Sequence, residues 1–394
     1  MLNRRDLFAA SGAAAALSTA LGRAASAKDV TDVLSDADTL RGAIGLFERL
    51  PELNAESVLD FHTGYRVWMM KSLSKAQVMQ AVKVLRQNGI DPASDAPLDT
   101  VVDLLTADPV VALDLHNWER TQEIMWAKIK DVYDARADHF LAELADAERK
   151  GPGTLDLRPD LAIPDYTRYE IHIQPGGYVG DRFAGYIYYH GQNVVFPHGN
   201  YQDNLQVSWA RAMPRPADGT VRRVLDQGCS AGQFTMVLKK LFPEAEVWGN
   251  DVAAPMLRYA HMRTVKHGLE IHYAQELSEK SHFPDNHFDL ITNNLLVHEM
   301  PAAKVRELLA ESYRTLRPGG VYYPLDSYTG DQQRHTALSK YYAWRNYRWN
   351  HEVWWMEYYD LDIAQAMRDA GFKVDENGPA GRTDTTRNVI GYKV

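Results

Sequence analysis

Apolar positions in the first part of this chain recur at helical spacing. One predicted helix begins at Ser74, which can cap it, and ends just before Gly89. Its buried face would carry Val78, Ala81, Val82 and Leu85. Asp108 and Pro109 are typical of another helix start, and the pattern after them extends to residue 151, so we expect a break near its middle. The spacing predicts a helical domain over residues 28–150.

Residues 151–220 carry a different pattern. The Gly-Pro-Gly sequence at 151–153 is typical of a boundary between domains. Residues 169–173 alternate like a strand, the turn sequence at 175–177 follows, and residues 184–190 can return as a partner strand. This pattern predicts a β-rich connector.

From residue 221 onward, short apolar runs end in polar or acidic residues and alternate with helical spacing. In the first of these units, an apolar strand reaches Asp226 and joins a helix through Gly228 and Gly232. Glycine allows backbone angles that side chains forbid and lets a ligand approach the main chain closely. The G-x-G-x-x-G spacing of a dinucleotide site is absent, so the loop suits a ligand without phosphates.

Four further segments follow this loop in a fixed order. A second strand ends at Asp251, where a doubly wound fold commonly places a carboxylate for ribose hydroxyls. The third strand, the fourth strand with its following segment, and the Gly-Gly turn with the fifth strand occupy residues 271–276, 288–301 and 316–326. Together with the glycine loop, these landmarks resemble the class I S-adenosylmethionine (SAM) dependent methyltransferases over about residues 221–326 and 361–394.

The resemblance implies an α/β fold: a Rossmann-like, doubly wound, seven-stranded sheet with the helical domain added before it, and a core over residues 221–394. It implies SAM as cofactor and transfer of its methyl group to oxygen or nitrogen of a small molecule. Asp226 would bind the methionine portion and Asp251 the ribose. The full set of implied cofactor-binding residues is Asp226, Gly228, Ser230, Gly232, Asp251, Val252, Gln275, Glu276 and Asn293. The family also implies that residues just before the core cover the cofactor, with Tyr178, Arg182, Tyr186 and Tyr201 as contributors; packing on a hairpin is the alternative for each.

An oxygen or nitrogen acceptor can require removal of a proton. His298 follows the fourth strand, and the ordinary pKa of histidine, near 6.5, suits proton transfer around neutrality. We therefore predict His298 as general base, with Glu299 orienting it or acting in its place; a histidine bonded locally at a helix start is the alternative. Other histidines, including His172, His190 and His198, form no spacing typical of a metal site, so no metal is predicted.

The segment 327–360 interrupts the core and is rich in aromatic residues and arginine. An insertion that leaves the fifth strand emerges at the edge where open α/β sheets bind ligands, so it can close over a substrate that is aromatic or anionic. It can equally be a helical hairpin that packs on residues 28–150 or forms a dimer interface. The side chains concerned are Tyr341, Tyr342, Trp344, Tyr347, Trp349, Trp354, Trp355, Tyr358 and Tyr359, with Arg334, Arg345 and Arg348.

Composition narrows the function classes. The net charge of −9 provides no broad basic surface, which makes nucleic acid a poor candidate substrate. Cys229 is the only cysteine, so an intrachain disulfide and a multi-cysteine metal site are excluded. Two other functions stay open besides methyl transfer: a non-catalytic SAM-binding sensor, and a partner-binding module whose aromatic insertion docks another protein.

The first 27 residues have the order of an export signal. Arg4 and Arg5 precede a mild apolar run over residues 9–21, and Ala25-Ser-Ala27 resembles a cleavage site. The adjacent arginines resemble the twin-arginine signal, which predicts a periplasmic protein. The apolar run is shorter than the roughly 20 residues that span a bilayer as a helix, so no membrane anchor is expected. Because SAM is made in the cytoplasm, export and cofactor supply conflict, and a cytoplasmic location is the alternative.

Overall fold

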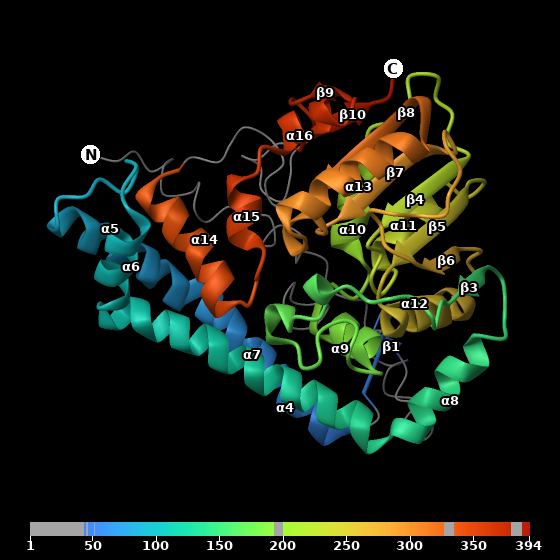
Figure 1. The fold of residues 1–394 in the computed structure, drawn as a ribbon. Helices are drawn as coiled ribbons and strands as arrows, with labels where there is room; N and C mark the ends of the chain where they lie inside the picture. Colours follow the sequence, from blue (N-terminus) through green and yellow to red (C-terminus); the bar gives the residue numbers. More distant parts are fainter. Residues whose placement is uncertain (1–42, 45, 51, 193–199, 327–334, 380–387) are drawn as a thin grey trace.

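The computed structural model describes residues 43–44, 46–50, 52–192, 200–326, 335–379 and 388–394. The predicted export signal lies outside these ranges. A large twisted sheet with helices on both faces forms one side of the molecule, and long helices extend from it on the other (Figure 1). Within the described ranges, no helix combines the length and apolar character needed to cross a bilayer.

The sheet has eight strands in the order β3-β6-β5-β4-β7-β8-β10-β9. The five strands from β6 to β8 run parallel, and β10 runs antiparallel to both of its neighbours. The strands span Thr154–Asp156 (β3), Arg223–Gln227 (β4), Glu246–Asp251 (β5), His272–Gln275 (β6), Phe288–Asn294 (β7), Leu316–Leu325 (β8), Lys373–Asp375 (β9) and Ile390–Tyr392 (β10). The expected doubly wound α/β fold is confirmed, and β3 adds an eighth strand that pairs in parallel with β6.

Alternation along the strands explains why both faces are covered. Val224 and Leu225 are adjacent in β4 and point to opposite faces, each into a different apolar cluster. One face packs against α10, α11 and α12, and the other against α13 and α16. These helices span Asn204–Arg211 (α10), Gln233–Leu241 (α11), Ala254–Lys266 (α12), Ala302–Thr315 (α13) and Ile363–Asp369 (α16).

Helices dominate the described residues before the sheet, as predicted. They are α4 (Leu53–Trp68), the π-helical turn η2 (Met69–Leu73), α5 (Ser74–Gln87), α6 (Leu98–Thr106), α7 (Pro109–Ala135) and α8 (Ala137–Ala147), after a short hairpin of β1 (Ala43–Ile44) and β2 (Phe47–Glu48). Asp108 caps α7 through the backbone N–H groups of Val110 and Val111, and the expected break falls at Arg136. The expected cap at Ser74 is wrong, because the helix continues through η2 and the Ser74 hydroxyl instead bonds Asp114.

The predicted hairpin in the connector is also wrong. Residues 165–167 and 171–173 form short 3₁₀ turns, η3 (Asp165–Thr167) and η4 (Ile171–Ile173), and residues 184–190 form helix α9 (Ala184–His190). Helix α9 is buried on nearly every side between α7 and α12. Gly185 allows this approach, because a Cβ atom there would lie 2.3 Å from the Cβ of Tyr259. Residues 184–190 are mostly apolar or aromatic because α9 is buried on nearly every side, and not because they form a strand.

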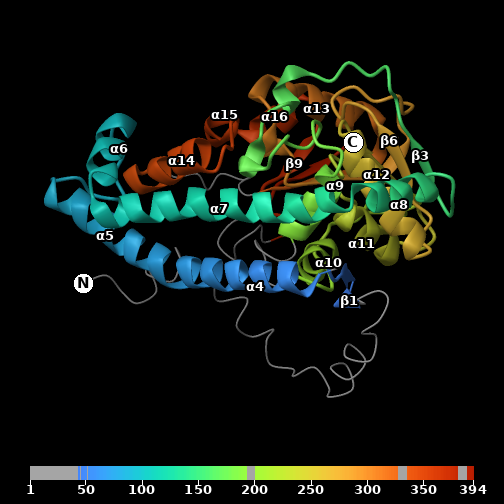
Figure 2. The ribbon, with the colours of Figure 1, turned by 90° about the horizontal axis from the view of Figure 1, so that it is seen from below.

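The aromatic insertion forms α14 (Ala337–Trp349) and α15 (Trp355–Asp360). Helix α14 lies against α6 and α7, as Figures 1 and 2 both show. Tyr342 donates a hydrogen bond to Gln77, and Arg345 pairs with the buried Asp114. The alternative of a helical hairpin that packs on the preceding helical domain is therefore the one that holds for α14.

Candidate active site

A pocket lies at the carboxyl ends of the central parallel strands, where the strand order reverses between β4 and β7. Ligands of open α/β sheets bind at this position. The empty space measures about 790 Å³ including its open mouth. Its lining comprises Tyr166, Thr167, Ile171, Tyr178, Val179, Tyr188, Gly228, Ser230, Asp251, Val252, Met256, Leu277, Ser278, Glu279, Asn294, Leu295, Leu296, Glu299 and Met300.

The charge of this pocket is one-sided. Asp251, Glu279 and Glu299 contribute three carboxylates, and among the described residues that line it there is no lysine or arginine. Tyr166 donates a hydrogen bond to Glu279 over 2.6 Å, and three tyrosine rings border the space. The pocket therefore suits a ligand with positive charge, hydroxyl groups and an aromatic or apolar part.

The loop after β4 is held to the end of β5 by Asp251. The two carboxylate oxygens of Asp251 accept hydrogen bonds from the backbone N–H groups of Ser230, over 2.9 Å, and Ala253, over 2.8 Å. Gly228 and Ser230 have φ angles of +61° and +51°, so the loop turns through the left-handed region at both. Burial raises the pKa of Asp251, and these backbone hydrogen bonds oppose the increase.

Asp226 and Gly232 support this loop from below rather than lining the pocket. The Asp226 carboxylate is 1% exposed and accepts a hydrogen bond from the Thr235 hydroxyl over 2.6 Å, while its Oδ1 has no hydrogen-bond partner among the described residues. Burial raises the pKa of Asp226 to about 7. A Cβ atom at Gly232 would lie 2.6 Å from the Tyr273 hydroxyl, so helix α11 and strand β6 pack tightly there. Direct contact of Asp226 with the cofactor stays a prediction.

Of the four other implied cofactor residues, one lines the pocket and three do not. Val252 lines the pocket beside Asp251. Gln275 donates to the Val252 carbonyl over 3.1 Å and accepts from the backbone of Arg158, so it positions this edge without lining it. Glu276 and Asn293 are buried: Glu276 accepts from the Asn250 amide, and Asn293 donates to the Tyr322 hydroxyl.

The connector contributes three tyrosines to the pocket, of which one was expected. Tyr178 does line the pocket, as do Tyr166 and Tyr188, which the sequence pattern did not single out. The other three expected contributors lie elsewhere: Tyr186 donates to Glu143, Arg182 is exposed beside Asp134, and Tyr201 packs on the cluster between α7 and α9. Glu279 was also missed, although it follows the predicted third strand by three residues.

His298 lies behind the pocket wall, in η6 (Val297–Glu299). Its Nδ1 is 2.6 Å from Oδ1 of Asp326, and its Nε2 is 3.8 Å from Oε2 of Glu352. Burial opposes protonation, but the carboxylates of Asp326 and Glu352 outweigh it and raise the pKa of His298 to about 9. Glu299 is the residue of the pair that reaches the pocket, and the role of His298 as general base stays a prediction.

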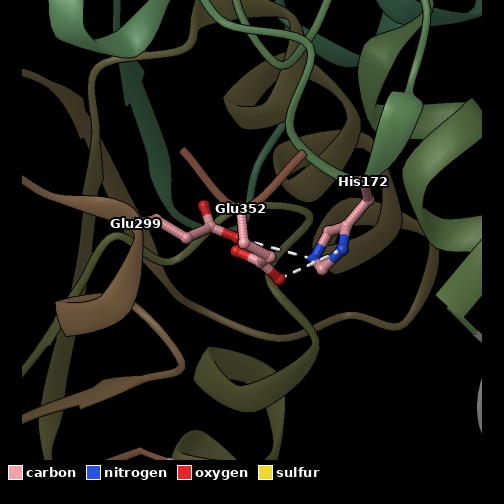
Figure 3. Close-up of side chains that lie close together, drawn as sticks. All are labelled: His172, Glu299 and Glu352. Carbon is pink, nitrogen blue, oxygen red and sulfur yellow. Dashed lines mark ion pairs between the residues drawn. The ribbon is translucent and has the colours of Figure 1, made fainter. Parts of the chain in front are cut away.

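Glu299 also faces a second histidine. Nε2 of His172 lies 3.7 Å from Oε1 of Glu299, and Nδ1 of His172 lies 3.3 Å from Oε1 of Glu352 (Figure 3). Tyr178 donates a hydrogen bond to Oε1 of Glu299 over 3.0 Å. Burial raises the pKa of Glu299 to about 8. Spacing along the chain gave no sign of this cluster, because its members come from the connector, the segment after β7 and the insertion.

The insertion reaches the cluster but not the pocket. None of its described residues is part of the pocket lining. Trp355 and Tyr358 pack with ring centres 4.9 and 5.9 Å from that of His298, and Arg345 lies over the Trp118 ring and pairs with Asp114. Arg334 lies outside the described residues. Trp355 and Tyr358 therefore cover His298, and none of the described insertion residues encloses the pocket.

Sequence similarity agrees with this placement of the site. Residues 224–320 match the family model of the methyltransferase domain. The chain is 34% identical over 110 residues to the demethylmenaquinone methyltransferase of Thermus thermophilus, covering 28% of this chain and 49% of that protein. It is 30% identical over 120 residues to the ubiquinone/menaquinone biosynthesis C-methyltransferase UbiE of Desulfotalea psychrophila, covering 30% and 47%. The chain thus spans about half the length of these curated relatives.

Two solved structures illustrate the similarity at the level of coordinates. A putative methyltransferase of Haloferax volcanii, in complex with the activator Trm112, is 18% identical with a TM-score of 0.38, covering 54% of this chain and 97% of that one. Phosphoethanolamine N-methyltransferase 2 of Haemonchus contortus is 23% identical with a TM-score of 0.34, covering 48% and 42%. The match of residues 224–320 to the methyltransferase-domain model and the strand order of the sheet agree with the expected fold.

Proposed function

We propose that this protein is a SAM-dependent methyltransferase that acts on a small molecule. The observation that carries the proposal is the pocket at the ends of β4, β5, β6 and β7, with three carboxylates and no basic side chain among its described lining residues. SAM carries a positive sulfonium, a positive ammonium and one carboxylate, so a pocket with this charge favours it over nucleoside phosphates. The family match over residues 224–320 supports the same ligand.

Named residues of the pocket fit separate parts of SAM. Asp251 would accept hydrogen bonds from the ribose hydroxyls, since each carboxylate oxygen has a second lone pair beyond its backbone hydrogen bond. Gly228 and Ser230 would bring the main chain close to the methionine portion. Tyr166 and Glu279 border the end of β6, on the side where the family places the adenine.

When bound, SAM supplies a methyl group on a positively charged sulfur, and transfer to a protonated acceptor also releases a proton. Holding the acceptor in line with that bond is the main task of the pocket wall. We assign Glu299 to proton removal, because it lines the pocket, and His298 to positioning Glu299 from behind. The sequence predicts oxygen or nitrogen as the acceptor atom. One of the two curated relatives is named as a C-methyltransferase, so carbon is a further candidate for the acceptor atom.

One experiment separates this proposal from its alternatives. Purified protein is incubated with SAM carrying a labelled methyl group and a panel of small hydroxyl, amine and activated-carbon acceptors, and the products are analysed by mass spectrometry and NMR. A methylated product in the presence of the protein alone supports an enzyme. SAM binding without any labelled product supports the sensor, and the absence of SAM binding supports a partner-binding module and overturns the proposal.

We also propose export by the twin-arginine route, on the basis of Arg4, Arg5 and Ala25-Ser-Ala27. This route carries proteins that are already folded, so a protein that binds SAM in the cytoplasm can leave with the cofactor in place. The proposal is tested by the location of the protein in its native host.

A further inference from the structure

Four side chains from distant parts of the chain border one small space behind the pocket. His172, Glu299 and Glu352 each offer one nitrogen or oxygen atom, and these three atoms all lie within 4.8 Å of one another (Figure 3). Nε2 of His172 is 3.7 Å from Oε1 of Glu299. Nε2 of His298 is 4.0 Å from the same Glu299 oxygen and 3.8 Å from Oε2 of Glu352.

We propose that this space binds one divalent transition-metal ion, with His172, Glu299 and Glu352 as ligands and His298 as the fourth. Bonds of about 2.0 to 2.2 Å to nitrogen and oxygen place neighbouring ligand atoms roughly 3 to 3.5 Å apart. The ligand atoms of His172, Glu299 and Glu352 lie within 4.8 Å of one another, and the three separations of 3.7, 3.8 and 4.0 Å are also longer than this spacing, so the side chains must rotate inward to bind an ion. A mixed set of imidazole and carboxylate ligands suits Zn²⁺, Mn²⁺ or Fe²⁺.

One carboxylate oxygen of the cluster is available to a cation. Glu352 is 2% exposed, and among the described residues its Oε2 atom has no hydrogen-bond partner. A buried carboxylate oxygen without a hydrogen bond is unfavourable because it has lost its hydration. Among the described residues, the ion-pair partners of Glu299 and Glu352 are the two histidines, and no lysine or arginine pairs with either. A divalent ion would bind this Oε2 atom of Glu352 together with the Glu299 carboxylate.

An outer layer of hydrogen bonds orients the proposed ligands. Because Asp326 accepts at Nδ1 of His298, the Nε2 atom of that ring faces the other side chains. The Asn350 amide donates toward Nδ1 of His172 and Oε1 of Glu352, and it is itself fixed by hydrogen bonds from Trp118 and Gln122. A metal-bound histidine typically donates its other ring N–H to a carboxylate, as His298 can to Asp326.

The backbone at His172 is held in an uncommon conformation. His172 and Ile173 have φ angles of +57° and +61°, in the left-handed region that L-residues rarely adopt. The His172 carbonyl accepts a hydrogen bond from the buried Trp126 indole over 2.7 Å, which fixes this turn. Such conformations are strained and gather at functional sites. Here the turn directs the imidazole toward the two glutamates (Figure 3).

The location gives the ion a role that rests on the proposed function. Glu299 belongs both to the cluster and to the pocket lining, so the ion would lie beside the acceptor end of the SAM pocket. There it would bind an anionic or hydroxyl oxygen of the acceptor and lower the pKa of that group. With the ion bound, Glu299 would act as a ligand, and this lowered pKa would take the place of proton removal by Glu299. The acceptor class that follows is a small molecule with a metal-binding oxygen next to the methylated atom.

Metal binding itself is measured without SAM or acceptor. The untagged protein is stripped with a chelator and dialysed against Zn²⁺ and, separately, Mn²⁺, and bound metal is quantified by mass spectrometry. We expect one ion per chain and at least a tenfold loss of affinity in Glu352→Gln and in His172→Asn. Asn removes the imidazole but tolerates the positive φ angle. Glu123→Gln, an exposed glutamate of α7 paired with Arg120, is the matched control and should bind as the wild type does.

The outcomes are distinguishable from those of the proposed function. Less than a tenth of an equivalent of either ion, or unchanged affinity in a folded variant of His172 or Glu352, overturns the metal site. Circular dichroism identifies a variant that fails to fold, in which case the other variant decides. SAM affinity is measured on the same samples: intact metal binding without SAM binding contradicts the methyltransferase and leaves the metal site standing.

Discussion

Asp226 provides a test of the buried strand end that needs no ligand. Its carboxyl group is 1% exposed, one oxygen accepts from Thr235, and the other has no hydrogen-bond partner within the described part of the chain. Burial raises its pKa from the usual 3.8 to about 7. In the unfolded chain the group ionises near pH 4, whereas in the folded protein it keeps its proton up to about pH 7.

The sign and size of the effect follow from this difference. Below pH 4 both states hold the proton, and the stability contributed by Asp226 is fully present. As the pH rises toward 7, the unfolded chain releases its proton and the folded protein does not, so the free energy of unfolding falls. A pKa difference of roughly three units corresponds to about 4 kcal/mol, lost over this window and constant above it. Asp226→Asn keeps the shape of the side chain and lacks this loss.

Urea denaturation of both proteins, followed by tryptophan fluorescence at several pH values and constant ionic strength, measures the difference. We expect the free energy of unfolding of Asp226→Asn, relative to the wild type, to increase by about 4 kcal/mol between pH 4 and pH 8. Asp160→Asn, at an exposed loop position, serves as the control for a substitution without burial. If the difference in unfolding free energy between Asp226→Asn and the wild type stays constant across this range, Asp226 ionises normally in the folded protein. The raised pKa of Asp226 would then be wrong.

Two further predictions address packing and location. Gly232→Ala should destabilise the protein by about 1 to 3 kcal/mol more than Gly89→Ala. The φ angle is +74° at both positions, but only at Gly232 does the new Cβ atom meet Tyr273 and Ala260. Equal losses of unfolding free energy in urea denaturation would exclude the clash. Replacing both Arg4 and Arg5 by lysine should keep the protein in the cytoplasm. The exported wild type should begin at or near Lys28 on N-terminal sequencing. A full-length wild type found only in the cytoplasm contradicts export.

The sequence was informative where the signal is local. An apolar strand that ends in an acid and is followed by glycines is a short pattern, so Asp226, Asp251 and the loop between them were located correctly in the fold. Asp108 and Pro109 likewise marked the start of α7. Each of these features depends on residues within a few positions of one another.

Features that depend on distant packing were not predictable in this way. Helix α9 was mistaken for a strand because its burial depends on α7 and α12, which the local pattern does not include. His172 lies in the connector and Glu352 in the insertion. These two residues are 180 positions apart in the chain and come into contact only in the folded protein. His298 was located near the pocket, but the carboxylates that alter its pKa come from β8 and the insertion, so its charge state could not be foreseen.

The most direct test of the central claim is calorimetric titration of SAM into the wild type and into Asp251→Asn. Asparagine retains an oxygen that can accept from the loop but removes the charged acceptor for the ribose hydroxyls. We expect one SAM site in the wild type and an affinity lower by one to two decades in the variant. This is the loss expected when hydrogen bonds to a charged group worth about 1.5 to 3 kcal/mol are removed. No heat of binding in the wild type, or equal affinity in a folded Asp251→Asn variant, would contradict the claim.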